Sequence, residues 1–409
     1  MLSTDGLGTE IMDRADQLAA ISESPSCLTR RYLTPGHAAA NRLVSTWMVE
    51  AGMTARIDAI GNVVGRYEAS VANAPALILG SHMDTVIDGG RYDGMLGVIT
   101  PISCVKALRA AGKRFDFAIE VVGFGDEEGV RYSSTLLGSR ALAGTFDHTL
   151  LGRRDANGIT LADAMLSFGL NPDRIGDAAR QPRDVLAYVE LHIEQGPVLE
   201  TRDRPVGAVT SIAGATRLAV SLEGVAGHAG TVPMDARHDA LAAAAEIVLA
   251  VEARCRGAGD LVGTVGALEV LPGAVNVIPG RVALSVDIRA AEDTVRKKAV
   301  EDIGVAIGKI AAARGVADEV VLTHESPSCP CAPWLTEQIA VAIGDDVVRL
   351  PSGAGHDAAA MAELTDVGMI FVRCTGGISH NPAEAILLED AQAGAETLLR
   401  LIGNFEKGN

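Results

Sequence analysis

The stretch Ala76-Leu-Ile-Leu-Gly-Ser-His-Met-Asp84 joins a short apolar run directly to a His-x-Asp pair. Apolar runs of this length, bounded by glycine or charged residues, are typical of buried strands. Helical patterns separate several such runs, so the alternation predicts an α/β sandwich with a parallel or mixed sheet. The other runs expected to form strands of this sheet are 62–67, 117–124, 186–191, 346–350 and 369–374.

The length of 409 residues exceeds what one hydrophobic core usually supports and favours two domains. Between residues 213 and 325 the pattern changes to the order β-α-β-β-α-β, which is that of a ferredoxin-like unit. We therefore expect a discontinuous α/β/α catalytic domain with a mixed sheet, residues 1–212 and 326–409. An α+β domain, residues 213–325, is inserted into it. The opening segment, about residues 8–56, is expected to be helical.

Composition excludes several classes of protein. The formal net charge is −17 and aromatic residues make up 3%, whereas nucleic-acid binders need a basic face and usually stacking aromatics. The first ten residues do not resemble a secretory signal, and no apolar run approaches the roughly 18 residues of a membrane span. Six scattered cysteines suit free thiols in a reducing cytoplasm, where we expect the protein to work. The pair Cys329-Pro-Cys331 could alternatively chelate a metal.

Histidines and acids follow four of the expected strands. Because open α/β sheets bind ligands beyond the carboxyl ends of their strands, we expect these groups to converge in one crevice. Each of them taken alone could instead be a polar core residue, a helix cap or a solvated charge. They are His82, the pair Glu127 and Glu128, His192, and His380, which comes after a glycine loop.

Asp93, in Tyr-Asp-Gly, adds a carboxylate that can bridge two ions. Two divalent ions about 3.5–4 Å apart are commonly bridged in this way and accept imidazole and carboxylate ligands. We assign Glu128 as a ligand and Glu127 as the general base, which takes a proton from water and passes it to the leaving nitrogen. Asp84 is expected to accept the second N–H of His82 and so fix its tautomer.

These residues, in this order, resemble the binuclear metallohydrolase family of aminoacylases, carboxypeptidases and dipeptidases. The closer resemblance is to its amidohydrolase branch, which contains N-carbamoyl-L-amino acid hydrolases, allantoate amidohydrolases and β-ureidopropionases. The peptidase relatives generally have a carboxylate where His192 stands, so Leu191-His-Ile-Glu-Gln-Gly-Pro197 marks the branch. The resemblance spans nearly the whole chain, and its other stretches are Gly80-Ser-His-Met-Asp-Thr85, Gly90-Arg-Tyr-Asp-Gly94, Asp126-Glu-Glu-Gly129, Gly227-His-Ala-Gly230, Ser352-Gly-Ala-Gly-His-Asp357 and Gly377-Ile-Ser-His-Asn-Pro-Ala-Glu384.

The resemblance implies two divalent ions in each subunit, of zinc, manganese, cobalt or nickel. One ion would be held by His82, Asp93 and His192, and the other by Asp93, Glu128 and His380. It also implies that Glu127 is the catalytic base. No metal position departs from the pattern of the branch.

The resemblance further implies a homodimer formed through the inserted domain. Because only two chain crossings connect this domain to the rest, we also expect it to act as a lid that moves between open and closed positions. His228 would reach the active site of the partner chain and polarise the scissile carbonyl. Arg289 and Asn276 would hold the substrate carboxylate, and Gln195 and His356 would line the pocket. Without the resemblance, the sequence favours a turn histidine at His228 and a surface salt bridge at Arg289, and a helix cap is the alternative role of His356.

We therefore expect a hydrolase that cleaves a ureido (carbamoyl) C–N bond in a small carboxylate substrate, either allantoate or an N-carbamoyl-L-amino acid. The alternative within the family is an aminoacylase or dipeptidase, which cleaves an ordinary amide. The alternative from another class is a binding protein that retained the fold and lost the chemistry. Such a protein should lack Glu127 or a ligand, and this sequence has all of them.

Overall fold

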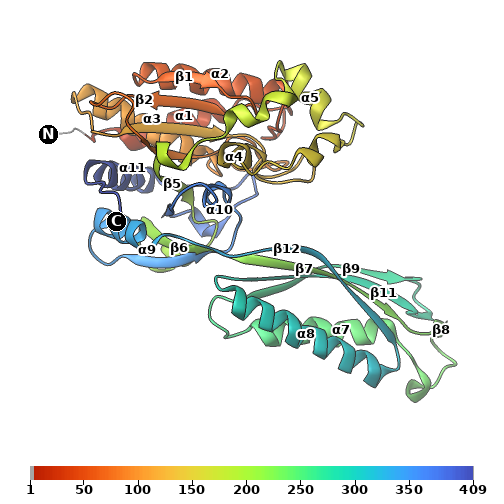
Figure 1. Ribbon diagram of the computed structural model, residues 1–409. Helices are drawn as coiled ribbons and strands as arrows, with labels where there is room; N and C mark the ends of the chain where they lie inside the picture. The colour runs from red at the N-terminus through yellow and green to blue at the C-terminus, as the bar shows by residue number, and fades with distance from the viewer. Residues whose placement is uncertain (1–3, 409) are drawn as a thin grey trace. The chain divides into compact units, whose positions relative to one another are not determined.

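The computed structural model describes residues 4–408 and divides into two compact units (Figure 1). Unit 1 takes in the chain up to Thr210, Cys331–Leu350, and the chain from Ala354 onwards. Unit 2 consists of Ser211–Pro330 and Pro351–Gly353. The inserted segment expected from the sequence, residues 213–325, lies within unit 2.

The larger sheet has nine strands, and the mixed α/β fold expected from the sequence is confirmed. The four central strands pair in parallel and are almost entirely buried, which explains their continuous apolar sequences. Its strands, in spatial order, are β1 (Thr54–Ile57), β2 (Val63–Tyr67), β4 (Ala118–Phe124), β3 (Ala76–His82), β5 (Val185–Ile193), β15 (Val367–Val372), β6 (Val206–Ile212) and β13 (Cys329–Pro330), with β14 (Val348–Ser352) paired to β6.

Helices cover the sheet of unit 1. α1 (Leu7–Ala19), α3 (Met95–Ala110) and α11 (Leu388–Gly403) pack against one another, and their buried side chains share one core with the central strands. α2 (Pro35–Glu50) packs on β1 and β2. Pro101 lies inside α3, in its second turn. The shorter helices are α4 (Leu137–Ala143), α5 (Leu161–Phe168), α6 (Val198–Thr201), α9 (Pro333–Ile343) and α10 (Asp357–Met361).

Unit 2 has the order β-α-β-β-α-β that the sequence predicted. Its four-stranded sheet has the spatial order β12-β7-β11-β9, and every neighbouring pair is antiparallel. The two helices cover one face of this sheet and form a separate core with it (Figure 1). The elements are β7 (Gly214–Glu223), α7 (Ala240–Cys255), β9 (Val262–Leu271), β11 (Arg281–Ala290), α8 (Asp293–Arg314) and β12 (Ala317–Ser326), with two short paired strands, β8 (Gly227–His228) and β10 (Val277–Ile278).

The expectation of a helical segment over residues 8–56 is wrong in its middle and at its end. Residues 20–34 form a loop between α1 and α2, and β1 begins at Thr54. Pro25 disfavours a continuous helix, and α2 restarts with Pro35 in its first turn behind the capping side chain of Thr34. Across the described part of the chain, no helix combines the length and apolar character needed to cross a membrane.

Candidate metal centre

The expected ligands gather at the carboxyl ends of the parallel strands of unit 1. His82 is the last residue of β3, His192 lies in β5, and the Glu127–Glu128 turn follows β4. His380 lies in the loop after β15, and Asp93 lies two residues before α3 begins. We expected both His82 and His192 to lie just beyond their strands. This was wrong, because pairing continues through His82 opposite Phe124 and His192 opposite Phe371.

The carboxylate of Asp93 lies between two groups of side chains. Its Oδ1 is 3.6 Å from His82 Nε2 and 3.1 Å from His192 Nε2. Its Oδ2 is 3.2 Å from His380 Nε2, and that nitrogen is 3.5 Å from Glu128 Oε1. Within each group, one ligand atom of every residue lies within 4.8 Å of the others. Asp93 therefore offers one oxygen to each of two neighbouring groups, each able to hold a metal ion.

Two of the imidazoles are oriented by backbone oxygens. His82 Nδ1 is 3.0 Å from the carbonyl oxygen of Asp84, and His192 Nδ1 is 2.8 Å from that of Ile193. A hydrogen bond from each Nδ1 leaves Nε2 directed toward Asp93, where a metal would bind.

The carboxylate of Asp84 differs from its expected position. Its Oδ1 is 3.8 Å from His82 Nδ1, whereas its two oxygens accept hydrogen bonds from the backbone N–H groups of Glu127, at 3.0 Å, and Glu128, at 3.1 Å. The residue thus orients His82 through its carbonyl and the acid pair through its carboxylate. Sequence spacing indicated the first partner and gave no signal for the second.

Asp93 is held by residues that sequence reasoning did not single out. Glu384 Oε1 accepts hydrogen bonds from the backbone N–H groups of Tyr92 and Asp93, at 2.9 and 3.1 Å. Ser379 Oγ donates to Asp93 Oδ2 at 3.1 Å and lies 2.9 Å from Glu384 Oε2. Gln195, which we expected to line the substrate pocket, also donates to Asp93 Oδ2, at 3.1 Å. Both Ser379 and Glu384 lie in the stretch 377–384, which carries the resemblance around His380. That stretch was the sequence signal that could have identified them.

The charge of the site favours cations. Burial raises the pKa of Glu128 to about 7 and holds the pKa of Glu127 well above its usual range. Burial also raises the pKa of Asp84. Crowding several acids in a buried site disfavours their ionised forms, and divalent cations between them would offset that cost. Imidazole and carboxylate ligands at these distances therefore fit two divalent ions.

His356 lies beside this centre but makes no helix cap. Its buried ring packs edge-on against His192, with ring centroids 4.6 Å apart. It stands at the N-cap position of α10 without a side-chain capping bond, so the alternative role considered for it is not seen. Among the described residues, the groups with metal-ligand spacing contain neither Cys329 nor Cys331.

Three further candidates belong to unit 2. His228, in β8, is exposed and pairs with Val277, next to Asn276. Arg289 lies in β11, where Nε donates to Asp287 at 2.9 Å and Nη1 donates to the carbonyl oxygen of Gly353 at 2.8 Å. The salt bridge that we considered as an alternative for Arg289 is therefore present.

The chain is similar to proteins of known class. A family model described as peptidase family M20/M25/M40 matches residues 78–404. An N-carbamoyl-L-amino acid amidohydrolase of Geobacillus stearothermophilus is 42% identical over 98% of this chain and 99% of that protein. An allantoate deiminase of Arabidopsis thaliana is 40% identical over 97% of this chain and 82% of that protein. The solved structure of a hydantoinase/carbamoylase family amidase from Burkholderia multivorans has a TM-score of 0.91 at 33% identity, covering 96% of both chains.

Proposed function

The chain belongs to the M20/M25/M40 peptidase family, and we propose that within it the protein is an amidohydrolase cleaving a ureido (carbamoyl) C–N bond. It is a metal-dependent hydrolase whose substrate is a small carboxylate, either allantoate or an N-carbamoyl-L-amino acid. The observation that carries the proposal is the Asp93 carboxylate, which offers one oxygen to His82 and His192 and the other to His380. We further propose that the protein works in the cytoplasm, where its cysteine thiols would stay reduced.

The residues divide the chemistry among them. His82, Asp93 and His192 would hold one divalent ion, of zinc, manganese, cobalt or nickel, and Asp93, Glu128 and His380 would hold a second. Ions there would supply a water that loses its proton near neutral pH and a Lewis acid for the carbonyl. Glu127 takes the proton from this water and delivers it to the departing nitrogen. The hydrogen bonds from the backbone N–H groups of Glu127 and Glu128 to the Asp84 carboxylate hold the turn that carries this base.

The arrangement of unit 2 supports a site completed by a second chain. His228 and Asn276 lie beside the end of β11 at Arg281, whereas Arg289 lies at the other end of the same strand. Eight residues of extended strand separate these ends by about 26 Å. One small substrate cannot contact both ends of a single unit 2. We therefore place His228 in the site of the partner in a homodimer, where its imidazole stabilises the developing oxyanion.

Substrate recognition is assigned to Arg289, Asn276, Gln195 and His356. The guanidinium of Arg289 is the group suited to a substrate carboxylate, because its planar fork can make two parallel hydrogen bonds. Its ion pair with Asp287 holds the side chain in one orientation, and Nη1 donates to the carbonyl oxygen of Gly353, a bond that it could exchange for one to the substrate carboxylate. Asn276 would supply a further donor from the partner chain.

An activity panel tests the function. The purified protein, loaded with Mn²⁺ or with Zn²⁺, is assayed against allantoate, N-carbamoyl-L-amino acids, N-carbamoyl-β-alanine, N-acetyl amino acids and dipeptides. We expect turnover of a ureido substrate to exceed turnover of every ordinary amide. A preference for N-acetyl or dipeptide substrates would instead assign the protein to the aminoacylases and dipeptidases of the family.

A further inference from the structure

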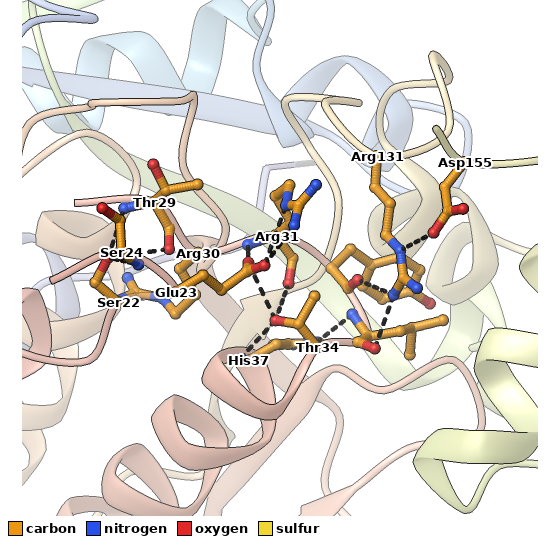
Figure 2. Close-up of polar contacts among 12 residues, drawn as sticks. Ser22, Glu23, Ser24, Thr29, Arg30, Arg31, Thr34, His37, Arg131 and Asp155 are labelled. Atoms are coloured by element: carbon orange, nitrogen blue, oxygen red, sulfur yellow. Dashed lines mark hydrogen bonds and ion pairs between the residues drawn. The ribbon is translucent and has the colours of Figure 1, made fainter. Parts of the chain in front are cut away.

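The loop between α1 and α2 is an ordered strap, which we define as residues 22–34. The hydroxyl of Ser22 organises it by donating to the carbonyl oxygen of Cys27 at 2.6 Å and accepting from the backbone N–H of Thr29 at 2.9 Å. Figure 2 shows the contact of Ser22 with Thr29 together with the ion pair of Arg131 and Asp155. The strap is thus held by its own polar groups despite lacking regular secondary structure.

The strap runs along the segment that follows β3. That segment carries Asp93 and so forms part of the metal centre. Arg30 N–H donates to Thr85 Oγ1 at 2.9 Å, and Thr85 N–H donates back to the carbonyl oxygen of Arg30 at 3.0 Å. Gly89 N–H donates to the carbonyl oxygen of Leu28 at 2.9 Å. These bonds fix the strap against the backbone immediately after His82.

The side chain of Arg30 is fully buried and reaches the same segment. Its Nε donates to the carbonyl oxygen of Met83 at 2.8 Å, and Nη1 donates to those of Leu18 and Ile21 at 2.9 and 3.0 Å. Within residues 4–408, Nη2 has no hydrogen-bond partner. Burying a guanidinium among carbonyl groups costs desolvation free energy. We therefore expect Arg30 to have a role in addition to packing.

The guanidinium of Arg30 keeps its positive charge in this buried position. Burial lowers the pKa of Arg30 to about 10, with Asp84 acting in the opposite direction, so the side chain remains a cation at neutral pH. The carboxylate of Asp84 accepts the N–H groups of Glu127 and Glu128. Arg30 is therefore a buried cation that is favoured by the negative charge of Asp84.

Arg131 connects the strap to the segment that follows the Glu127–Glu128 turn. It follows Glu128 by three residues, and its Nη1 donates to the carbonyl oxygens of Tyr32 and Leu33 at 2.9 and 2.8 Å. Its Nε pairs with Asp155 at 3.0 Å (Figure 2). The strap consequently contacts two of the loops that carry residues of the centre, the one after β3 and the one after β4.

We propose that Arg30 is a positioning residue of the metal centre, acting through its hydrogen bond to the Met83 carbonyl. Fixing the Met83 peptide sets the direction of His82 on one side and of Asp84 on the other. Asp84 then sets the Glu127–Glu128 turn. This inference rests on the proposed function, since it assumes that the centre binds divalent ions.

The test measures metal binding apart from turnover. Arg30→Lys and Arg30→Met are compared with the native protein for Co²⁺ and Mn²⁺ affinity, by competition with a chelator, and for the visible spectrum of the Co²⁺ form. We expect binding about 10- to 100-fold weaker in Arg30→Met, the range typical when a group supporting a ligand is lost. The Co²⁺ spectrum should change as well. Arg30→Lys, which keeps the charge, should restore part of the affinity.

Arg14 provides the matched control. It is a buried arginine that anchors the same helix α1, through Ser103 and Glu10, without touching the centre. Arg14→Met should lower the unfolding temperature and leave Co²⁺ affinity and spectrum unchanged. Native affinity and spectrum in Arg30→Met, an equal loss in Arg14→Met, or failure of both Arg30 variants to fold would each overturn the inference. If the native protein binds no divalent ion, the proposed function fails instead.

Discussion

Glu127 and Glu128 are neighbours in sequence, but we assign them different tasks. Glu127→Gln should lower kcat by about 10²- to 10⁴-fold, the usual contribution of a general base, because an amide cannot accept the proton of water. Its metal content should stay that of the native protein, since Glu128 and the three histidines remain. The measurements are steady-state kinetics and metal analysis of the purified variant.

Glu128→Gln serves as the contrasting variant at this pair. It removes a ligand, so activity and about one equivalent of metal should be lost together. Retention of near-native activity in Glu127→Gln, or loss of metal from it, would refute the separation of roles.

Gly94 stands immediately before α3 and packs closely against a ligand of the centre. It has a φ of +75°, and a Cβ added there would lie 2.4 Å from the His82 ring. Gly94→Ala should therefore weaken metal binding and lower the free energy of unfolding by more than the about 1–2 kcal/mol that a positive φ costs a residue with a Cβ. Chelator competition and denaturant unfolding measure the two effects.

Gly112, just beyond the other end of α3, is the matched control for that prediction. It also has a positive φ, of +65°, but an added Cβ would meet nothing within 4 Å. Gly112→Ala should show the backbone strain alone, with native metal affinity. If both alanine variants bind metal equally, the close approach of Gly94 to His82 has no functional consequence.

At the scale of elements, the sequence predicted the strands well and the loops poorly. Apolar runs marked β3, β4, β5 and β15, because strands buried on both faces need continuous apolar sequence. Apolar residues at helical spacing continue to Ile21, so the pattern predicts a helix where residues 20–34 form a loop. Its fold depends on tertiary contacts such as those of Arg30, which no local pattern records.

The centre shows the same limit at the level of single atoms. Spacing placed the ligands at strand ends, because a sheet brings its carboxyl ends to one edge. Spacing could not tell which oxygen of Asp84 faces His82, since the carbonyl and the carboxylate lie in the same residue. The support of Asp93 by Glu384 arises from residues far apart in the chain, so only the folded structure reveals it.

At the scale of the whole molecule, the proposed exchange of His228 between subunits has a consequence that single variants cannot show. A chain with Glu127→Gln has an inactive centre but a normal His228. A chain with His228→Ala has a normal centre and lacks the group that it would lend to its partner. Each homodimer should be nearly inactive, because every site in it misses one residue.

Mixed dimers of these two variants should regain activity, because the isologous interface of a two-fold dimer brings residue 228 of each chain to the site of the other. In such a dimer the His228→Ala chain receives the imidazole of the Glu127→Gln chain, so one of the two sites is complete. Random pairing makes about half of all dimers mixed, and total activity should reach about a quarter of the native value. Co-expression with two affinity tags isolates the mixed dimers for assay. If purified mixed dimers stay as inactive as their parents, His228 acts within its own chain. An active His228→Ala homodimer would show instead that His228 has no part in catalysis.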